Sequence, residues 1–280
     1  NAVRPQGFHY DFAVNTNLVA MFLSHEFLTK DDFKIFSNFR LERLNYDYDN
    51  LMLDGRTKDD GTECTWLGNN GCYYSRPADE KISYSDSSFR FGFSKLVENN
   101  EFFFQLSKGF RPPQINELFR LQKSQTLANL NSEKIDSIEF GILSQGENFN
   151  NKFVLFSSKK NNFIYKDDDA STISDGKSKH QGIEVSGLVK IKPDLSIKYA
   201  WSFARHLYDY SFSEIGVVKG NYIDTAPKIY GSLFLNITTV KNLTLQIEEE
   251  YMGKYYTDKA SLHSYPGHFL TNFRGFYALT

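Results

Sequence analysis

The stretch Leu195-Ser-Ile-Lys-Tyr-Ala-Trp-Ser-Phe203 decides the fold of this chain. Every odd position in it is a large apolar residue, and the positions between are small or polar. Because successive side chains of a β-strand point to opposite faces, this alternation predicts a strand with one apolar and one polar face.

The same period of two recurs along the whole chain. We expect eleven strands, near residues 16–28, 33–46, 87–97, 101–110, 134–145, 151–165, 178–191, 194–209, 226–239, 242–256 and 268–279. Short turns (29–32, 98–100, 146–150, 192–193 and 240–241) alternate with long loops (47–86, 111–133, 166–177, 210–226 and 257–267). Long two-faced strands with connections sorted in this way are typical of an antiparallel up-and-down transmembrane β-barrel in a bacterial outer membrane.

The composition agrees with a β-barrel sheet that has one apolar face and one face exposed to water. Aromatic residues make up 16% of the 280 residues, yet hydrophobic residues reach only 40%. No apolar run approaches the ~20 residues of a membrane-spanning helix. The formal net charge of -2 provides no basic field, so nucleic acid is not an expected partner.

Cys64 and Cys72 are the two cysteines of the chain and lie close together in a stretch rich in Gly and Asn. Such a pair predicts a loop disulfide in an oxidising compartment, which would stiffen a loop that carries Trp66, Tyr73 and Tyr74. We expect no metal site, because further ligands are not visible. We also expect no catalytic residues and no cofactor, since no nucleophile elbow, phosphate loop or zinc helix motif is present.

Five segments carry a family resemblance. They are Lys108-Gly-Phe-Arg-Pro-Pro-Gln-Ile-Asn-Glu-Leu-Phe119, Ala128-Asn-Leu-Asn-Ser-Glu133 with Ser137-Ile-Glu-Phe-Gly141, Gly176-Lys-Ser-Lys-His-Gln-Gly-Ile-Glu184, Asp224-Thr-Ala-Pro-Lys228 and Tyr265-Pro-Gly-His-Phe-Leu-Thr-Asn-Phe-Arg274. In order and spacing, over roughly residues 85–280, they resemble the barrel of TonB-dependent outer-membrane receptors. The sequence departs from the family pattern at Ala128–Asn129, Ile138 and Lys228.

The resemblance implies a 22-stranded barrel with an N-terminal plug. Residues 1–280 would then be a single region of that barrel, about eleven of its strands, without the plug and the terminal strands. The implied function is TonB-energised import of a scarce ligand, most often a ferric siderophore or another metal chelate. The implied partners are outer-membrane lipid, the small ligand and the TonB complex through the plug. A passive porin-like channel is the alternative.

Candidate ligand-binding residues lie in the long loops and at the adjoining strand ends. They are Trp66, Tyr73, Tyr74, Arg111, Phe119, Arg120, Tyr208, Tyr210 and Tyr256. For the aromatic members two other interpretations stay open, namely packing within the loops and the interfacial girdle that anchors a barrel at headgroup level.

Overall fold

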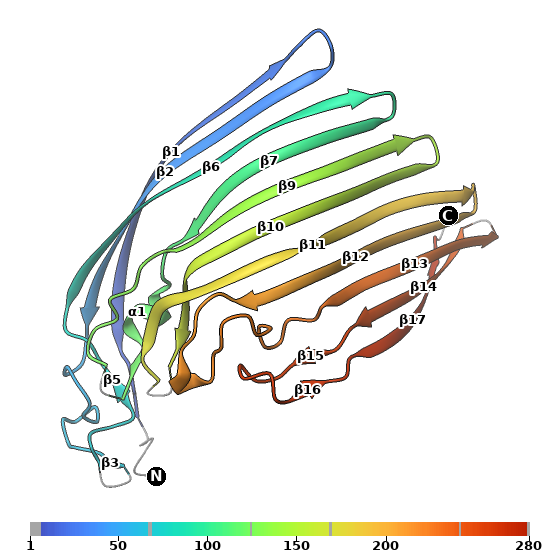
Figure 1. Ribbon diagram of the computed structural model, residues 1–280. Helices are drawn as coiled ribbons and strands as arrows, with labels where there is room; N and C mark the ends of the chain where they lie inside the picture. The colour runs from blue at the N-terminus through green and yellow to red at the C-terminus, as the bar shows by residue number, and fades with distance from the viewer. Residues whose placement is uncertain (1–6, 67–68, 124, 168–169, 241, 279–280) are drawn as a thin grey trace.

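The computed structural model describes residues 7–278 except 67–68, 124, 168–169 and 241. Its main feature is one antiparallel sheet of eleven strands, in which each strand pairs with the next long strand along the chain (Figure 1). The strands are β1 (Phe12–Leu28), β2 (Phe33–Asn50), β6 (Glu80–Val97), β7 (Asn100–Arg111), β9 (Glu133–Gly146), β10 (Phe149–Lys166), β11 (Thr172–Lys192), β12 (Leu195–Tyr208), β13 (Ile229–Val240), β14 (Leu243–Met252) and β17 (His268–Tyr277). All eleven predicted strands are therefore confirmed, as is the all-β fold.

The strands differ from prediction mainly at the end of the sheet that carries the long loops. β6 begins seven residues earlier than expected, at Glu80, and β11 six residues earlier, at Thr172. Ladder hydrogen bonds need only the backbone, so pairing continues into stretches that contain few apolar residues. In the added part of β6, Ile82 and Tyr84 still alternate with polar residues and pack against the buried cluster. β13 instead begins late, at Ile229, because Pro227 has no amide hydrogen to donate.

Short elements lie among the long loops: β3 (Thr65–Trp66), β4 (Asn69–Asn70), β5 (Tyr74–Ser75), α1 (Ile115–Phe119), β8 (Leu121–Gln122), the 3-10 turn Ser213–Ile215, β15 (Tyr255–Tyr256) and β16 (Ser264–Tyr265). The five-residue α1 was not predicted, since it is too short to show a helical period. Within the described ranges, no helix has the length and apolar character to cross a membrane.

The sheet has an apolar outer face and a polar inner face. The register places Phe140, Leu155, Ile183 and Phe203 side by side on four successive strands, and each is 38–43% exposed. This is the outer face. On the inner face Arg90 donates to Gln105, which donates to Glu139, at 2.7 Å in both cases.

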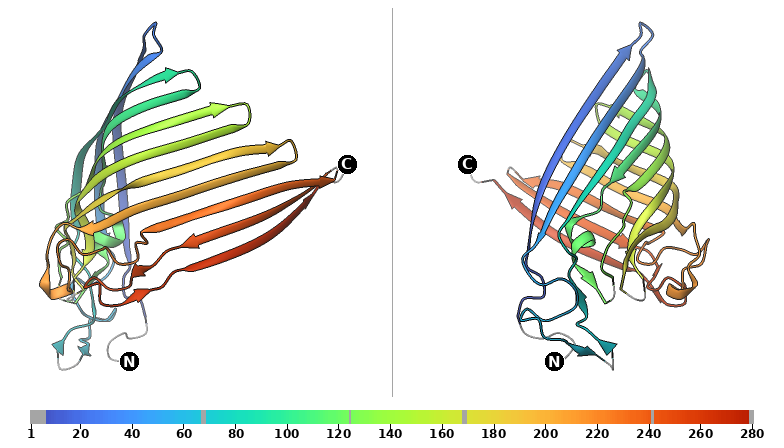
Figure 2. Two further views of the ribbon diagram at one scale, coloured as in Figure 1. Left: turned by 45° about the vertical axis from the view of Figure 1, so that its right-hand side comes forward. Right: turned by 90° about the vertical axis from the view of Figure 1, so that its left-hand side faces the viewer.

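The sheet is curved but not closed. β1 and β17 each pair on one side only, and the long loops gather at one end of the curved sheet (Figure 2). The largest buried cluster lies at this long-loop end, where Leu44, Tyr46 and Tyr48 of β2 are covered by residues of the loop between β7 and β9.

Candidate functional site

The loop between β7 and β9, residues 112–132, folds onto the inner face of the sheet, and we call it the inner loop. It begins with Pro112 and Pro113, which supply no amide hydrogens and so end the pairing of β7. Helix α1 then places Phe119, which is fully buried, against β2. The Phe119 ring stacks on Tyr48 with centroids 4.2 Å apart and meets Tyr46 edge-on at 6.4 Å. These contacts anchor the inner loop to the wall.

Two further contacts join the inner loop to the N-terminal part of the chain and to the loop between β2 and β6. β8 pairs with β5, so that Gln122 lies opposite Tyr74. The Tyr10 hydroxyl donates a hydrogen bond to the Leu121 carbonyl. Three segments that are far apart in sequence therefore meet at the long-loop end of the sheet.

An ion cluster around the buried carboxylate of Glu133 holds both ends of the inner loop. Arg111 donates to both carboxylate oxygens of Glu117 at 3.0 Å and to Glu133 at 2.7 Å. Glu133, only 3% exposed, also accepts from the Ile164 amide and pairs with Lys160, both at 2.9 Å. Burial alone would raise the pKa of Glu133, but the hydrogen bonds outweigh it and lower the pKa to about 2.

Beside the inner loop lies a cavity of about 490 Å³. Its lining comes from the N-terminal segment, the inner loop and the β10–β11 end, namely Tyr10, Asn116, Glu117, Arg120, Gln122, Ile164, Tyr165, Lys166 and Thr172. The volume is within the range of small-molecule sites, and the lining combines aromatic rings with a few charged groups, as such sites do.

The cavity is electropositive. Burial and the nearby positive charge of Arg120 lower the pKa of Lys166. Glu117 is already paired with Arg111, and among the described residues no carboxylate pairs with Arg120 or Lys166. The Arg120 guanidinium lies 5.3 Å from the centre of the Tyr10 ring. Cations beside aromatic rings suit an anionic ligand that itself contains flat groups.

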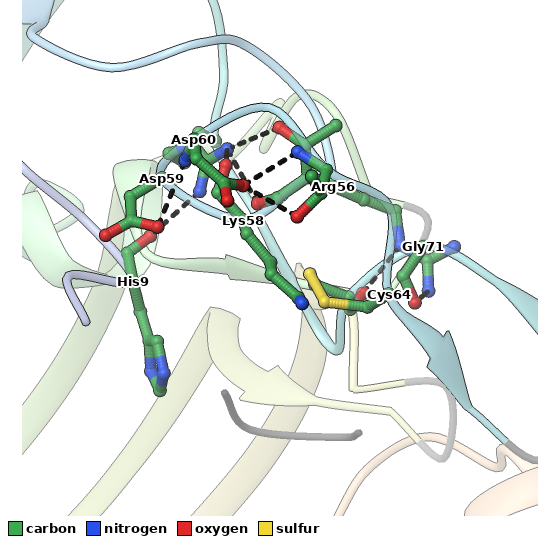
Figure 3. The surroundings of a disulfide bond; sticks show 11 residues. His9, Arg56, Lys58, Asp59, Asp60, Cys64 and Gly71 are labelled. Carbon is green, nitrogen blue, oxygen red and sulfur yellow. Dashed lines mark hydrogen bonds between the residues drawn. A yellow bond between two sulfur atoms is a disulfide. The ribbon is translucent and has the colours of Figure 1, made fainter. Parts of the chain in front are cut away.

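The predicted disulfide between Cys64 and Cys72 is confirmed, and it closes a compact fold of the β2–β6 loop (Figure 3). Arg56 reinforces this fold by donating to the Cys72 carbonyl at 2.8 Å. Arg76 is almost fully buried and donates to the carbonyl oxygens of Leu53, His9, Thr57 and Lys58. These contacts connect the part of the loop around β5 with the N-terminal segment and with the disulfide.

The predicted site residues do not all come together. Arg120 lines the cavity. Tyr210 does not line it, but its ring lies 5.9 Å from that of the lining residue Tyr165. Arg111 belongs to the ion cluster. Tyr256 lies elsewhere, stacked on Tyr222 at 6.1 Å.

The other predicted residues have packing contacts or lie beyond the description. Phe119, Tyr74 and Tyr208 are at most 4% exposed, and Tyr208 donates a hydrogen bond to Asp224. The backbone carbonyl of Tyr73 accepts from the Lys123 amide at 2.7 Å. The side chain of Trp66 lies outside the described residues.

Of the nine described residues that line the cavity, sequence reasoning named Arg120 and missed the other eight, among them Tyr10, Tyr165 and Lys166. Tyr165 and Lys166 are the last two residues of β10, at the same end of the sheet as Arg111, the last residue of β7. Their position at the same end of the sheet as Arg111 could have placed Tyr165 and Lys166 among the candidate site residues. Tyr10 precedes β1, and no local pattern links it to the inner loop.

The family model described as TonB dependent receptor-like, beta-barrel, matches residues 4–280. The chain belongs to this family. The resemblance carried by the five segments is therefore confirmed. No curated protein sequence matches the chain.

Solved structures of other TonB-dependent receptors have the same fold. The ferric-catecholate import receptor Fiu from E. coli superposes with a TM-score of 0.74 at 15% identity, over 97% of this chain and 39% of that one. The siderophore receptor PiuA from Acinetobacter baumannii gives 0.72 at 14%, over 96% and 38%. The ferric yersiniabactin uptake receptor FyuA from Yersinia pestis gives 0.73 at 13%, over 94% and 38%. The chain thus spans about two fifths of their length.

Proposed function

We propose that this chain forms the ligand-capturing part of an outer-membrane receptor for TonB-energised import, and that its cargo is an anionic metal chelate such as a ferric siderophore. The short turns would then face the periplasm and the long loops the outside. TonB would act through a plug supplied by the complete receptor. The electropositive, ring-lined cavity at the long-loop end supports the choice of an anionic cargo.

Charge balance is the physical argument for this cargo. Arg120 and Lys166 both face the cavity without a carboxylate partner among the described residues, while Arg111 neutralises Glu117. Both side chains are exposed, so the attraction for an anion comes from their charge and hydrogen-bond donors and not from burial. A chelate with net negative charge and aromatic or planar donor groups would supply that anion and pack against Tyr10 and Tyr165.

The alternative function, a passive porin-like channel, accounts for fewer of the observed features than an energised receptor does. It shares the two-faced wall and the sorted connections with energised receptors. Family membership and the inner loop, which is anchored at the inner face by Phe119 and Glu133, both favour the receptor.

Titration of the full-length receptor with two ferric probes tests the cargo. We expect a ferric tris-catecholate, which is anionic, to bind, and a neutral ferric tris-hydroxamate of similar size to bind much more weakly. Arg120→Gln and Lys166→Gln should each weaken tris-catecholate binding by about 10- to 100-fold, because a hydrogen bond to a charged group contributes roughly 1.5–3 kcal/mol. Quenching of intrinsic fluorescence measures the dissociation constants.

Lys81→Gln is the matched control, since Lys81 is an exposed cation that pairs with Asp47 away from the cavity. It should leave binding unchanged. Equal affinity for the two probes, or unchanged tris-catecholate binding in both cavity variants, would disprove the anionic-chelate proposal.

A further inference from the structure

A pair of histidines lies on the inner face of the sheet, outside the candidate ligand cavity. His180 of β11 lies directly opposite His206 of β12, and their Nδ1 atoms are 2.8 Å apart. The ring centroids are 5.1 Å apart and the rings are inclined at 54°. Each histidine is three positions from an outer-face residue, Ile183 or Phe203, so its side chain projects from the inner face. Of the six histidines, each of which lies within the described ranges, only these two face each other across neighbouring strands.

The surroundings of the pair orient one ring and leave both rings accessible. Ser178, only 5% exposed, has its Oγ atom 2.8 Å from Nε2 of His180. The next inner-face row toward the short turns consists of Gly182 and Ala204, and the β10 residue opposite His180 is Ser158. Both histidines are partly exposed. Because the neighbouring side chains are small, an ion with its water ligands can approach the two rings.

The distance between the two nitrogens matches that between neighbouring ligands of one metal ion. Imidazole nitrogens bind Zn²⁺ at ~2.0–2.1 Å. At that bond length, two nitrogens at a right angle lie about 2.8–3.0 Å apart, and two at a tetrahedral angle about 3.3–3.4 Å apart. The observed 2.8 Å favours the right-angle arrangement, which is typical of Cu²⁺ and Ni²⁺ with nitrogen and oxygen ligands. Among the divalent first-row ions, Cu²⁺ also binds such ligands most strongly.

The charges near the pair permit a divalent cation. Lys160 of β10 lies opposite Ser178, but its charge is balanced by Glu133 at 2.9 Å. Glu184 lies on the same face of β11, four residues from His180, and attracts cations at longer range. The pair therefore does not meet an unbalanced positive charge from the neighbouring strand.

We propose that His180 and His206 bind a divalent transition-metal ion, preferably Cu²⁺, through their two Nδ1 atoms. In the bound form the proton that lies between the rings moves to Nε2 of His206, and Nε2–H of His180 donates to Ser178 Oγ. Water completes the coordination, since no third histidine, cysteine or carboxylate joins the pair among the described residues. The ion would link β11 to β12 close to the last residue of β12, Tyr208. No metal site was expected from the sequence, because the two histidines are 26 residues apart.

Copper titration of the full-length receptor, free of chelate, tests the proposal. Cu²⁺ is added to the receptor in detergent, and electron paramagnetic resonance counts the imidazole nitrogens bound to it. We expect one Cu²⁺ ion with two nitrogens. His180→Gln and His206→Gln should each leave at most one nitrogen and weaken binding by about 100-fold or more, because loss of an outer-shell partner alone typically costs about 10- to 100-fold. Ser178→Ala should keep both nitrogens and weaken binding by about 10-fold, since Ser178 only orients the His180 ring.

The matched control is His25→Gln, which removes an exposed histidine of β1 that lies opposite Ser37 and not opposite another histidine. It should keep the two-nitrogen spectrum, and circular dichroism should show that all variants are folded. A two-nitrogen spectrum that persists in both His180→Gln and His206→Gln would overturn the proposal, as would its absence from the unmodified receptor with equimolar Cu²⁺. The pair lies outside the ligand cavity, so failure of chelate binding would leave this readout unaffected.

Discussion

Two glycines in the wall lie where an aromatic ring of the neighbouring strand crosses them. A Cβ at Gly141 would overlap the Phe103 ring and approach the Phe153 carbonyl oxygen to 2.8 Å. A Cβ at Gly231 would overlap the Trp201 ring in the same way. The rings shield backbone that would otherwise be exposed, and the close fit leaves no room for a side chain.

Gly141→Ala should therefore destabilise the full-length receptor by about 1–3 kcal/mol, the usual cost of overpacking a fitted position. Urea unfolding from lipid vesicles measures the difference. Gly275→Ala is the control, because a Cβ there would lie 3.8 Å from the nearest Leu245 atom, an ordinary contact. Equal stability of the two variants would mean that the Phe103 ring moves aside at little cost.

At the scale of elements, the inner loop is the decisive feature. It has one short helix, and its position depends on the stacked Phe119 and on the ion cluster around Glu133. Because Asn116, Glu117, Arg120 and Gln122 belong to this loop and line the cavity, release of the loop would remove part of the candidate site.

Acidification should release the inner loop. The pKa of Glu133 is about 2 when folded and close to the ordinary 4.5 when exposed. A lowered folded pKa stabilises the folded loop fully above pH 4.5, and this stabilisation is lost as the pH falls toward 2. A spin label at exposed residue 127 of the full-length receptor should therefore become mobile over that range.

Glu133→Gln should make the same label mobile already at neutral pH, since the carboxylate that pairs with Arg111 and Lys160 is then absent. Its mobility should change little between pH 4.5 and 2. A label that stays immobile at pH 2 in the unmodified receptor would show that packing of Phe119 alone holds the loop.

In the proposed outer-membrane setting, the two faces of the whole molecule meet two different solvents. Along most of their length the strands present apolar side chains on the outer face and polar ones on the inner face, and β1 and β17 leave the sheet open at both edges. An unpaired strand edge in hydrocarbon is costly, so both edges would need hydrogen-bonding partners in that setting.

The orientation of the two faces can be tested at mid-strand. Leu155→Arg puts a charge on the outer face of β10 and should destabilise the full-length receptor in vesicles by about 2–4 kcal/mol, the cost of Arg at the bilayer midplane. Ala200→Arg puts the same charge on the inner face of β12, where Lys198 already lies, and should cost far less. Similar losses in urea unfolding would contradict the assignment of outer and inner faces.

The sequence by itself determined the strands, their two faces, the sorting of the connections and the disulfide. These features are local: alternation along Leu195–Phe203 has a period of two, and Cys64 and Cys72 are only eight residues apart. Five short segments were enough to identify the family, because their order and spacing reflect the order of the strands.

Only the tertiary structure decided where the candidate site lies. Tyr10, Arg120 and Lys166 are far apart in the chain and meet because the inner loop folds back onto β2. Nothing in the sequence near Phe119 distinguishes a ligand contact from a core residue, since both are aromatic residues in a loop.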